Sequence, residues 1–412
     1  MKNFHSNLAE CHHCGILQAI PPMQEGSHSL CVRCGCLLHK HSRDTVQKTL
    51  ALAVAGLILF VITNAYPFLA LQVEGRIQDA SLMTGVQYFF DNGMQELAIM
   101  ILFTCILVPC FQLLVLVYIL FPIMNDKVAP HTAYIFRVFR NFMPWSMIEV
   151  FLLGILISVI KLTKLAEVVP GPALWTYIAL IGVITFAFSG LNQQDIWRRL
   201  PVNNLLEPPQ FGHKHIVCHS CLMTFKWTAE NEKNHIDCPR CHAPLHYRKT
   251  DSLQRTTALV LAALILYVPA NVMPITVTYF LGAEQSDTIM SGVLFFMFSG
   301  SWHIALIIFI ASVVIPLTKL LILIYLLFAV KYKVKLSPKA CTKLYQFTEA
   351  VGRWSMVDVY VVTVLVALVQ LDPFAVIKAG PGVGYFASVV VITMFAAESF
   401  DPRLLWDQEE SL

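Results

Sequence analysis

Residues 311–330 read ASVVIPLTKLLILIYLLFAV, and this stretch indicates the class of the protein. The apolar run extends from about Ile304 to Val330, which is long enough to cross the ~30 Å hydrocarbon core of a bilayer. Lys319 interrupts the run, and a charge near the centre of a span costs roughly 2.5–3.5 kcal/mol on insertion scales. We therefore predict a transmembrane helix whose lysine has a partner or a function.

The composition places the whole chain in the same class. Of its 412 residues, 57% are hydrophobic and only 13% are charged, which is typical of a polytopic membrane protein. The net charge of +3 does not favour nucleic-acid binding, and the first residues, MKNFHSNLAE, lack the apolar core of a signal peptide. Long apolar runs predict eight membrane spans, at residues 49–68, 96–121, 142–162, 173–189, 255–273, 304–329, 354–371 and 383–399.

The distribution of basic residues predicts the orientation of these spans. Segments 122–141 and 331–353 are rich in lysine and arginine. Segments 69–94 and 275–302 are poor in them and contain several acids. By the positive-inside rule, the first two segments lie in the cytoplasm. Because the number of spans is even, both termini and the connector at 190–254 are expected there as well.

Motifs of the first half recur in the second half at a nearly constant offset. The recurring pairs are Cys11–Cys14 with Cys218–Cys221, Cys31–Cys34 with Cys238–Cys241, Asn64–Pro67 with Asn271–Pro274, Pro109 with Pro316, and Trp145 with Trp354. This pattern indicates a tandem duplication in which each copy is a cytoplasmic cysteine-rich module followed by four spans. The predicted domains are ribbon 1 (1–47), a first transmembrane unit (48–190), a connector with ribbon 2 (191–252), a second transmembrane unit (253–400) and a cytoplasmic tail (401–412).

Between the first and second spans of each unit lies a segment that we expect on the outer side. Residues 67–75, PFLALQVEG, and residues 274–282, PITVTYFLG, alternate apolar and polar side chains, which predicts a short strand in each. Apart from these strands, the predicted fold class is an all-α polytopic membrane protein with two four-helix bundles.

Both cysteine-rich modules have the pattern C-x2-C-x16-C-x2-C. The predicted metal ligands are Cys11, Cys14, Cys31 and Cys34 in ribbon 1 and Cys218, Cys221, Cys238 and Cys241 in ribbon 2. Two knuckles of this spacing place four thiolates at the corners of a tetrahedron, which suits one Zn²⁺ in each ribbon. Because four protein ligands leave no open position on the metal, the pattern favours a structural zinc site.

Other roles for the cysteines agree less well with the sequence. A thioredoxin-type site has one C-x2-C motif on a βαβ scaffold, which neither module supplies, and disulfides are disfavoured in the reducing cytoplasm. Zinc ribbons also bind nucleic acid, but these modules lack a clustered basic stripe. The remaining cysteines have no ligand spacing, and we interpret them as ordinary apolar or surface residues: Cys36, Cys105, Cys110 and Cys341.

Lys319 and Asp358 are ionisable residues placed inside predicted spans. Two explanations for Lys319 remain open: it caps the Ser312 carbonyl that Pro316 leaves free, or it pairs with Asp358 inside the bundle. A buried acid–base pair has coupled pKa values, which suits a proton relay. The hydroxyl groups of Ser312 and Thr393 could extend such a path.

The first unit differs at the corresponding positions. Gln112 stands at the position of Lys319, and Glu149 stands at that of Asp358, so the acid is kept and the base is lost. We expect Glu149 to be protonated or to form a hydrogen bond within the first bundle. Lys161 and Lys164, at the outer end of the third span, are expected to extend to the membrane surface. The second unit is therefore the better candidate for a proton-driven step.

Several motifs resemble the paraquat-inducible protein A family over essentially the whole chain. They are PANVMPI (269–275), VGRWSMVDV (351–359) and SFDPRLLWD (399–407), together with twin ribbons before twin four-span units. The resemblance implies a subunit of the Gram-negative inner membrane that works with a periplasmic MCE-domain protein to move lipid between the two membranes. It also implies zinc in the ribbons and four-helix units similar to tetraspanin and claudin bundles.

The resemblance also implies a network of polar side chains inside the membrane. Its members are a lysine, the aspartate of the GRWSM-x-D motif and a threonine of the last span, which fall here on Lys319, Asp358 and Thr393. A further acid that the family has near the outer end of the third span finds no match, because residues 161–164 read KLTK.

Three functions are compatible with these features. We favour phospholipid transport between the inner membrane and a periplasmic MCE-domain partner, with proton coupling through Lys319 and Asp358 as a further hypothesis. The sequence contains no Walker motif, G-x4-G-K-[ST], so any ATP would have to be used by another chain. The alternatives are a membrane anchor that moves no lipid and a membrane redox protein, for which no flavin or haem motif is present. We therefore expect no enzymatic activity.

Overall fold

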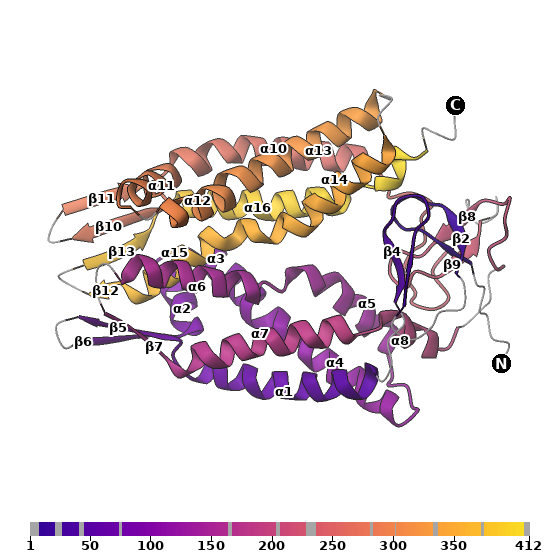
Figure 1. Cartoon of the computed structure of the whole chain (residues 1–412), viewed down its shortest axis with the longest axis horizontal. Coiled ribbons are helices and arrows are strands. Elements are labelled where there is room, and N and C mark those ends of the chain that lie inside the picture. The colour runs from indigo at the N-terminus through magenta and orange to yellow at the C-terminus, as the bar shows by residue number, and fades with distance from the viewer. Residues whose placement is uncertain are drawn as a thin grey trace.

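The structure is a computed structural model, and it describes residues 8–20, 27–40, 45–73, 76–163, 167–202, 207–227, 236–280, 283–300, 302–332, 337–371 and 375–407. Within these residues, eight helical stretches are long and apolar enough to cross a membrane: Val46–Ala65, Gln95–Met124, Thr132–Leu162, Pro172–Gly190, Ser252–Val272, Ala305–Lys331, Pro338–Leu368 and Gly382–Ser399. Each overlaps one of the predicted spans, but the third and the seventh begin earlier than predicted, at Thr132 and Pro338 rather than at residues 142 and 354. Figure 1 shows that they run side by side along the long axis of the molecule.

The two halves of the chain present their helices in a similar order. The first half contains α1 (Thr45–Ala65), α2 (Leu82–Asp91), α3 (Gln95–Ile101), η1 (Leu102–Leu107), α4 (Val108–Met124), α5 (Thr132–Phe142), η2 (Met143–Trp145), α6 (Ile148–Leu162), α7 (Pro172–Gly190) and α8 (Gln193–Arg199). The second half contains α10 (Ser252–Val272), α11 (Ile289–Phe298), α12 (Trp302–Phe309), η3 (Ile310–Val314), α13 (Ile315–Lys331), α14 (Pro338–Val351), η4 (Gly352–Met356), α15 (Val357–Leu368), α16 (Gly382–Ser399) and η5 (Pro402–Leu405).

Proline determines where two of the spans change helix type. Pro109 lies in the first turn of α4 and Pro316 in the first turn of α13, and each follows a segment of π-helix, η1 or η3. Because proline has no N–H to donate, an α-helix cannot continue through it unchanged, and the wider π-turn redistributes the backbone hydrogen bonds. Both spans therefore carry an irregular turn near their middle.

The two basic segments, at residues 122–141 and 331–353, contain helices. In α5, which reads TAYIFRVFRNF, Phe136 and Phe139 are buried, because aromatic residues recur at helical spacing on one face. Arg137 donates a hydrogen bond to the carbonyl of His242 in ribbon 2 at 2.8 Å. The corresponding helix of the second half, α14, continues through η4 into α15. These helices connect the ribbons to the membrane-spanning part.

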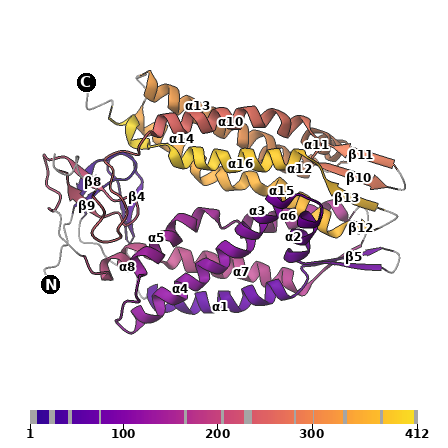
Figure 2. The same cartoon turned by 180° about the vertical axis from the view of Figure 1, so that it is seen from behind.

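Short strands form two antiparallel sheets at the end away from the ribbons. One sheet, ordered β6-β5-β7, contains β5 (Leu69–Val73), β6 (Arg76–Ala80) and β7 (Glu167–Pro170), and the other, ordered β11-β10-β13-β12, contains β10 (Thr276–Phe280), β11 (Ala283–Asp287), β12 (Gln370–Leu371) and β13 (Ala375–Ala379). The two predicted strands are confirmed as β5 and β10, but the prediction of an all-α protein omits the sheets that they join. Figure 2 shows both sheets opposite the ribbons.

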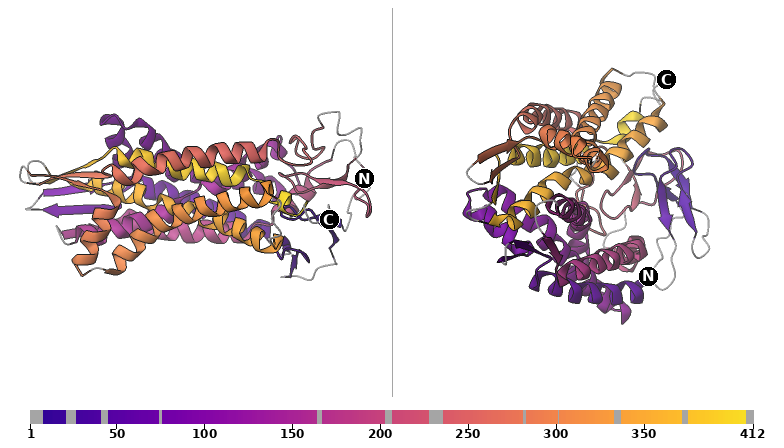
Figure 3. Two further views of the ribbon diagram at one scale, coloured as in Figure 1. Left: turned by 90° about the horizontal axis from the view of Figure 1, so that it is seen from above. Right: turned by 60° about the vertical axis from the view of Figure 1, so that its left-hand side comes forward.

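The two halves meet where α6 of the first half packs against α15 of the second. The helices approach closely at Gly154, where a Cβ atom would lie only 2.8 Å from the Cβ of Tyr360. The Ser158 hydroxyl donates to the Val361 carbonyl at 3.2 Å, and the hydroxyls of Thr104 and Tyr360 are 2.8 Å apart. The right panel of Figure 3 shows the two bundles side by side, one indigo to magenta and the other orange to yellow.

Gly154→Ala is expected to weaken this contact. The added methyl group would overlap Tyr360, whose backbone carbonyl carbon would also lie 3.2 Å away, so α6 and α15 must separate. We expect a loss of about 1–3 kcal/mol in stability, measured as a lower midpoint of thermal unfolding in detergent. The control is Gly182→Ala in α7, where a Cβ meets no atom within 4 Å. Equal midpoints for the two variants would contradict the close packing at Gly154.

Candidate functional site

The two cysteine-rich modules form small hairpins at one end of the molecule. Ribbon 1 pairs β1 (Leu8–Glu10) with β2 (Leu17–Ala19) and β3 (His28–Leu30) with β4 (Leu37–Lys40). Ribbon 2 pairs β8 (His215–Val217) with β9 (Thr224–Lys226), and a single bridge joins Asp237 to Pro244. Each C-x2-C pair occupies the turn between the two arms of a hairpin.

All four turns have the same backbone hydrogen bond. The N–H of the residue after the second cysteine donates to the carbonyl of the first cysteine, and the donors are Gly15, Gly35, Leu222 and His242, at distances of 2.8–2.9 Å. All four donors have positive φ, which glycine adopts without strain and which Leu222 adopts here at 57°. The turn directs both thiols of a pair toward the same point.

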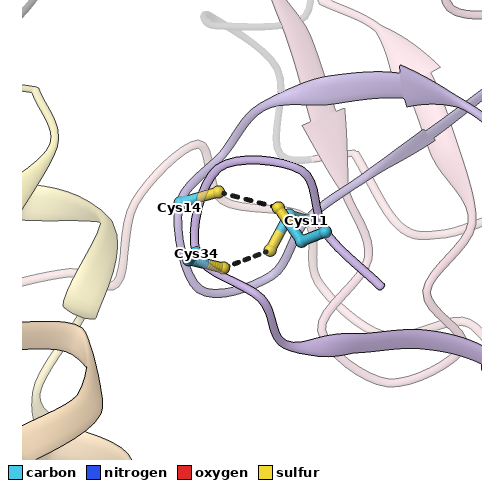
Figure 4. A group of neighbouring side chains, drawn as sticks. Cys11, Cys14 and Cys34 are labelled. Atoms are coloured by element: carbon cyan, nitrogen blue, oxygen red, sulfur yellow. Dashed lines mark hydrogen bonds between the residues drawn. The ribbon is translucent and has the colours of Figure 1, made fainter. Parts of the chain in front are cut away.

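The turns bring the eight predicted ligands together in two clusters, as their spacing predicts. Within each cluster the four sulfur atoms all lie within 4.8 Å of one another, and all four residues are buried. The closest pairs are each separated by 3.5 Å: Cys11–Cys34, Cys14–Cys31, Cys218–Cys241 and Cys221–Cys238. Figure 4 shows Cys11, Cys14 and Cys34 with their sulfur atoms gathered in this way.

The geometry of both clusters fits a metal ion. Four thiolates at the usual Zn–S distance of about 2.3 Å lie about 3.8 Å apart around a tetrahedral ion, close to the separations found here. Thiolates are the donors that soft or borderline ions such as Zn²⁺ prefer in tetrahedral sites. Each cluster can therefore hold one metal ion through protein ligands alone.

Cys36 joins the first cluster, which the sequence did not predict. Its Sγ lies 3.1 Å from the Sγ of Cys11 and 3.4 Å from the Sγ of Cys34, and its side chain is buried. The sequence predicts an ordinary apolar or surface residue at Cys36; the structure buries it, as expected of an apolar residue, but places its sulfur beside two of the predicted ligands. The other three additional cysteines lie outside both clusters: Cys105, Cys110 and Cys341.

A buried group of charged residues joins both ribbons to the segment after α16. Arg403, which is 1% exposed, donates hydrogen bonds from Nε and Nη2 to the two carboxylate oxygens of Asp401, at 3.0 and 2.9 Å. Its Nη1 lies 3.8 Å from Glu10 Oε1 in ribbon 1, and its Nη2 lies 3.2 Å from His219 Nε2 in ribbon 2. Burial raises the pKa of Asp401, but the hydrogen bonds from Arg403 outweigh it and lower this pKa to about 2. Asp401 is therefore the ionised partner of Arg403.

Further contacts hold the same C-terminal segment in place. Arg248 donates two hydrogen bonds to Asp407, at 3.0 and 2.6 Å, and the indole N–H of Trp406 donates to the Thr342 hydroxyl at 2.9 Å. The guanidinium of Arg33 in ribbon 1 lies 4.3 Å from the centroid of the Trp406 ring. The sequence identified this segment only as a family motif, because its partners are distant in the chain.

Lys319 lies inside the second bundle and is 4% exposed. Its Nζ forms no hydrogen bond within the described residues and packs beside η4, where a Cβ on Gly352 would lie 3.0 Å from Nζ. The predicted pair with Asp358 is not formed, because the Asp358 carboxyl lies at a cavity that α6 helps to line and α13 does not. Nor does Lys319 cap the Ser312 carbonyl.

Asp358 lines a cavity of about 70 Å³ between the two halves, near the sheet that contains β10 and β11. Lys161 of α6 and Asp287 of β11 line the same cavity. The sequence predicts that Lys161 extends to the membrane surface; in the structure it is partly exposed and also lines this cavity. Ser312 approaches the Asp358 carboxyl but donates its hydrogen bond to the Ile308 carbonyl, at 2.7 Å.

Thr393 and Glu149 lie away from this cavity. The buried Thr393 donates to the Val390 carbonyl of its own helix, α16, at 2.9 Å. Glu149 is exposed on the outside of α6 and accepts a hydrogen bond from the Thr185 hydroxyl of α7 at 3.3 Å, the predicted bond within the first bundle. Glu149 is therefore not part of a buried polar network. Lys164 lies outside the described residues.

Both halves of the chain match one family model, and proteins of known name are similar to the chain over nearly its full length. The family model described as paraquat-inducible protein A matches residues 46–201 and 253–410. The chain is 31% identical to intermembrane transport protein PqiA of Escherichia coli (strain K12), over 97% of this chain and 95% of that protein. It is 29% identical to lipophilic envelope-spanning tunnel protein A of the same strain (97% and 91%) and 31% identical to a probable intermembrane transport protein of Haemophilus influenzae (97% and 95%). No solved structure matches the chain. Because the family model matches both halves and these relatives align over nearly the full length, the chain belongs to the paraquat-inducible protein A family.

Proposed function

We propose that this protein is the inner-membrane subunit of a system that moves phospholipid between the inner and outer membranes of a Gram-negative cell. Its partner in this proposal is a periplasmic MCE-domain protein, which exchanges lipid with it. The observation that carries the proposal is similarity over 97% of the chain to proteins named for intermembrane transport. Eight apolar helices supply the membrane part that such a subunit needs.

The two ends of the molecule suit two different compartments. The ribbons and the basic helices α5 and α14 lie toward one end, whereas the sheets lie at the other (Figure 1). Free thiols persist in the reducing cytoplasm, and basic residues are retained there by the positive-inside rule. We assign the ribbon end to the cytoplasm and the sheet end to the periplasm. The edge strands β6 and β11 would then be available to the MCE-domain partner.

The cavity between the two halves is the proposed working site. A volume of about 70 Å³ accommodates a few water molecules, at ~30 Å³ each, but no phospholipid. We therefore assign to it a proton path through Asp358 and Lys161, because ionisable residues inside a membrane commonly mark such paths. In this proposal Lys161 has the role that the sequence analysis predicts for Lys319. Lipid moves along the apolar outer surface of the helices.

The ribbons and the repeated helices have supporting roles in this proposal. We assign one structural Zn²⁺ to each cysteine cluster, bound by its four predicted ligands. We also propose that the halves are a tandem duplication of a ribbon and a tetraspanin- or claudin-like four-helix unit, with boundaries at 1–47, 48–190, 191–252, 253–400 and 401–412. The two separate matches to the family model support this division.

Complementation tests the proposed site. Cells that lack the gene and redundant lipid-transport systems would express Asp358→Asn or Lys161→Met, and growth under detergent stress would be measured. We expect both variants to grow no better than cells without the gene, because each removes one charge from the cavity. Glu149→Gln should restore growth fully, because this side chain is exposed and does not line the cavity.

The complementation result is interpreted only for variants that reach normal abundance in the membrane and still bind the partner. Full growth with both Asp358→Asn and Lys161→Met would contradict a proton path through the cavity. It would favour a protein that anchors the partner and moves no lipid.

A further inference from the structure

The first cysteine cluster contains one more thiol than a tetrahedral metal ion requires. Cys36 Sγ lies 3.1 Å from Cys11 Sγ and 3.4 Å from Cys34 Sγ, closer than the 3.5 Å that separates Cys11 from Cys34. Its side chain is 8% exposed, so it is held inside the ribbon. A metal ion bound by the four predicted ligands would therefore have a fifth sulfur atom beside two of them.

The fold of the ribbon does not require a thiol at this position. In all four turns the N–H of the first cysteine donates to the carbonyl of the residue five positions later, and these acceptors are Ile16, Cys36, Met223 and Ala243. In the other three turns the residue at this position has an apolar side chain, and the turn forms the same hydrogen bond. Ala243 is the direct counterpart of Cys36 in the second cluster. At this position ribbon 1 therefore has a thiol and ribbon 2 has a methyl group.

We propose that Cys36 is an exchange ligand that lets ribbon 1 take up and release Zn²⁺ faster than ribbon 2. Zinc expands readily from four to five ligands, and a thiol held beside the site acts at a high effective concentration. With Zn²⁺ bound, the Cys36 thiol would lose its proton to water and displace Cys11 from the metal, and the Cys11 thiolate would take a proton from water. Because one of these two thiols can hold the metal while the other leaves, a chelator would enter at the vacated position and displace the remaining thiolates, which are then protonated in turn.

This exchange conserves charge and ligand number. The metal keeps four sulfur ligands and no electron is transferred, so no oxidant or reductant is needed. In ribbon 2 the corresponding position offers no thiol, because Ala243 stands there. The inference rests on the metal binding proposed above for both clusters.

The test follows metal release from the full-length protein in detergent. Zinc-loaded protein is mixed with the chromophoric chelator 4-(2-pyridylazo)resorcinol, and total zinc is measured by mass spectrometry. We expect a fast and a slow phase of equal amplitude. Cys36→Ala should slow the fast phase about tenfold while both ions remain bound. Ala243→Cys should accelerate the slow phase, because it gives ribbon 2 the same spare thiol.

Three outcomes would overturn the proposal, and they are distinguishable. An unchanged fast phase in Cys36→Ala would show that the spare thiol takes no part in release. Loss of one zinc ion from that variant would make Cys36 an obligatory ligand. Absence of zinc from the unaltered protein would refute the proposed metal binding itself. The alanine variant is expected to fold, since Ala243 fills the same position in ribbon 2.

Discussion

Removal of metal from the purified protein is expected to unfold both ribbons while the membrane-spanning helices stay folded. The ribbons contain only short hairpins, and zinc binding supplies about 10–16 kcal/mol of folding free energy in comparable zinc-finger peptides. We expect chelation to raise hydrogen exchange in β1–β4, β8 and β9 to the rate of an unfolded chain. The measurement is hydrogen exchange by mass spectrometry, with zinc analysis of the same sample.

Two cysteine variants control the metal-removal experiment. Cys218→Ser should lose the ion of ribbon 2 and expose β8 and β9, because it removes one of four ligands. Cys341→Ser changes a buried cysteine of α14 outside both clusters and should keep both ions. Ribbons that remain protected after complete removal of zinc would show that the metal does not hold them together.

Arg403→Met is expected to release the ribbons from the membrane-spanning part. The variant leaves Glu10 and Asp401 as buried acids without the guanidinium that lies between them. Removing one partner of a buried charge pair typically costs about 3–5 kcal/mol. We expect faster proteolysis of both ribbons in the native protein, measured as the rate of cleavage between ribbon and helix by a protease added at low concentration.

The matched control is Arg198→Met, which removes an exposed arginine of α8. Surface substitutions usually change stability by no more than about 0.5 kcal/mol, so its cleavage rate should be unchanged. Combining Arg403→Met with Asp401→Asn should recover part of the loss, because the second change removes an unpaired charge. A double variant that is cleaved as fast as Arg403→Met would contradict the electrostatic explanation.

The spans and the cysteine clusters could be predicted from the sequence because their signals are local. An apolar run of sufficient length identifies a span without knowledge of its neighbours, and two C-x2-C knuckles fix four thiols through their own turns. The short strands β5 and β10 were equally accessible from alternating residues. Each of these elements depends on side chains close together in the chain.

The partners of the buried charges could not be predicted, because they are set by how helices from different halves pack. The sequence predicts a pair between Lys319 and Asp358, since both lie in spans of the second unit. The structure instead places Asp358 and Lys161 on the same cavity, because α15 packs against α6. Arg403 likewise forms an ion pair with Glu10, which lies near the other end of the sequence. The position of Cys36 beside the first cluster could not be predicted, because the C-x2-C spacing identifies only the cysteines within the two motifs.

The central claim is phospholipid exchange with a periplasmic partner, and a reconstituted transfer assay tests it most directly. Proteoliposomes that contain this protein and radiolabelled phospholipid would be mixed with the MCE-domain partner, and label bound to the partner would be followed over time. We predict faster transfer than from protein-free liposomes, and transfer at the protein-free rate with Asp358→Asn. Label that reaches the partner equally fast from protein-free liposomes would contradict the account.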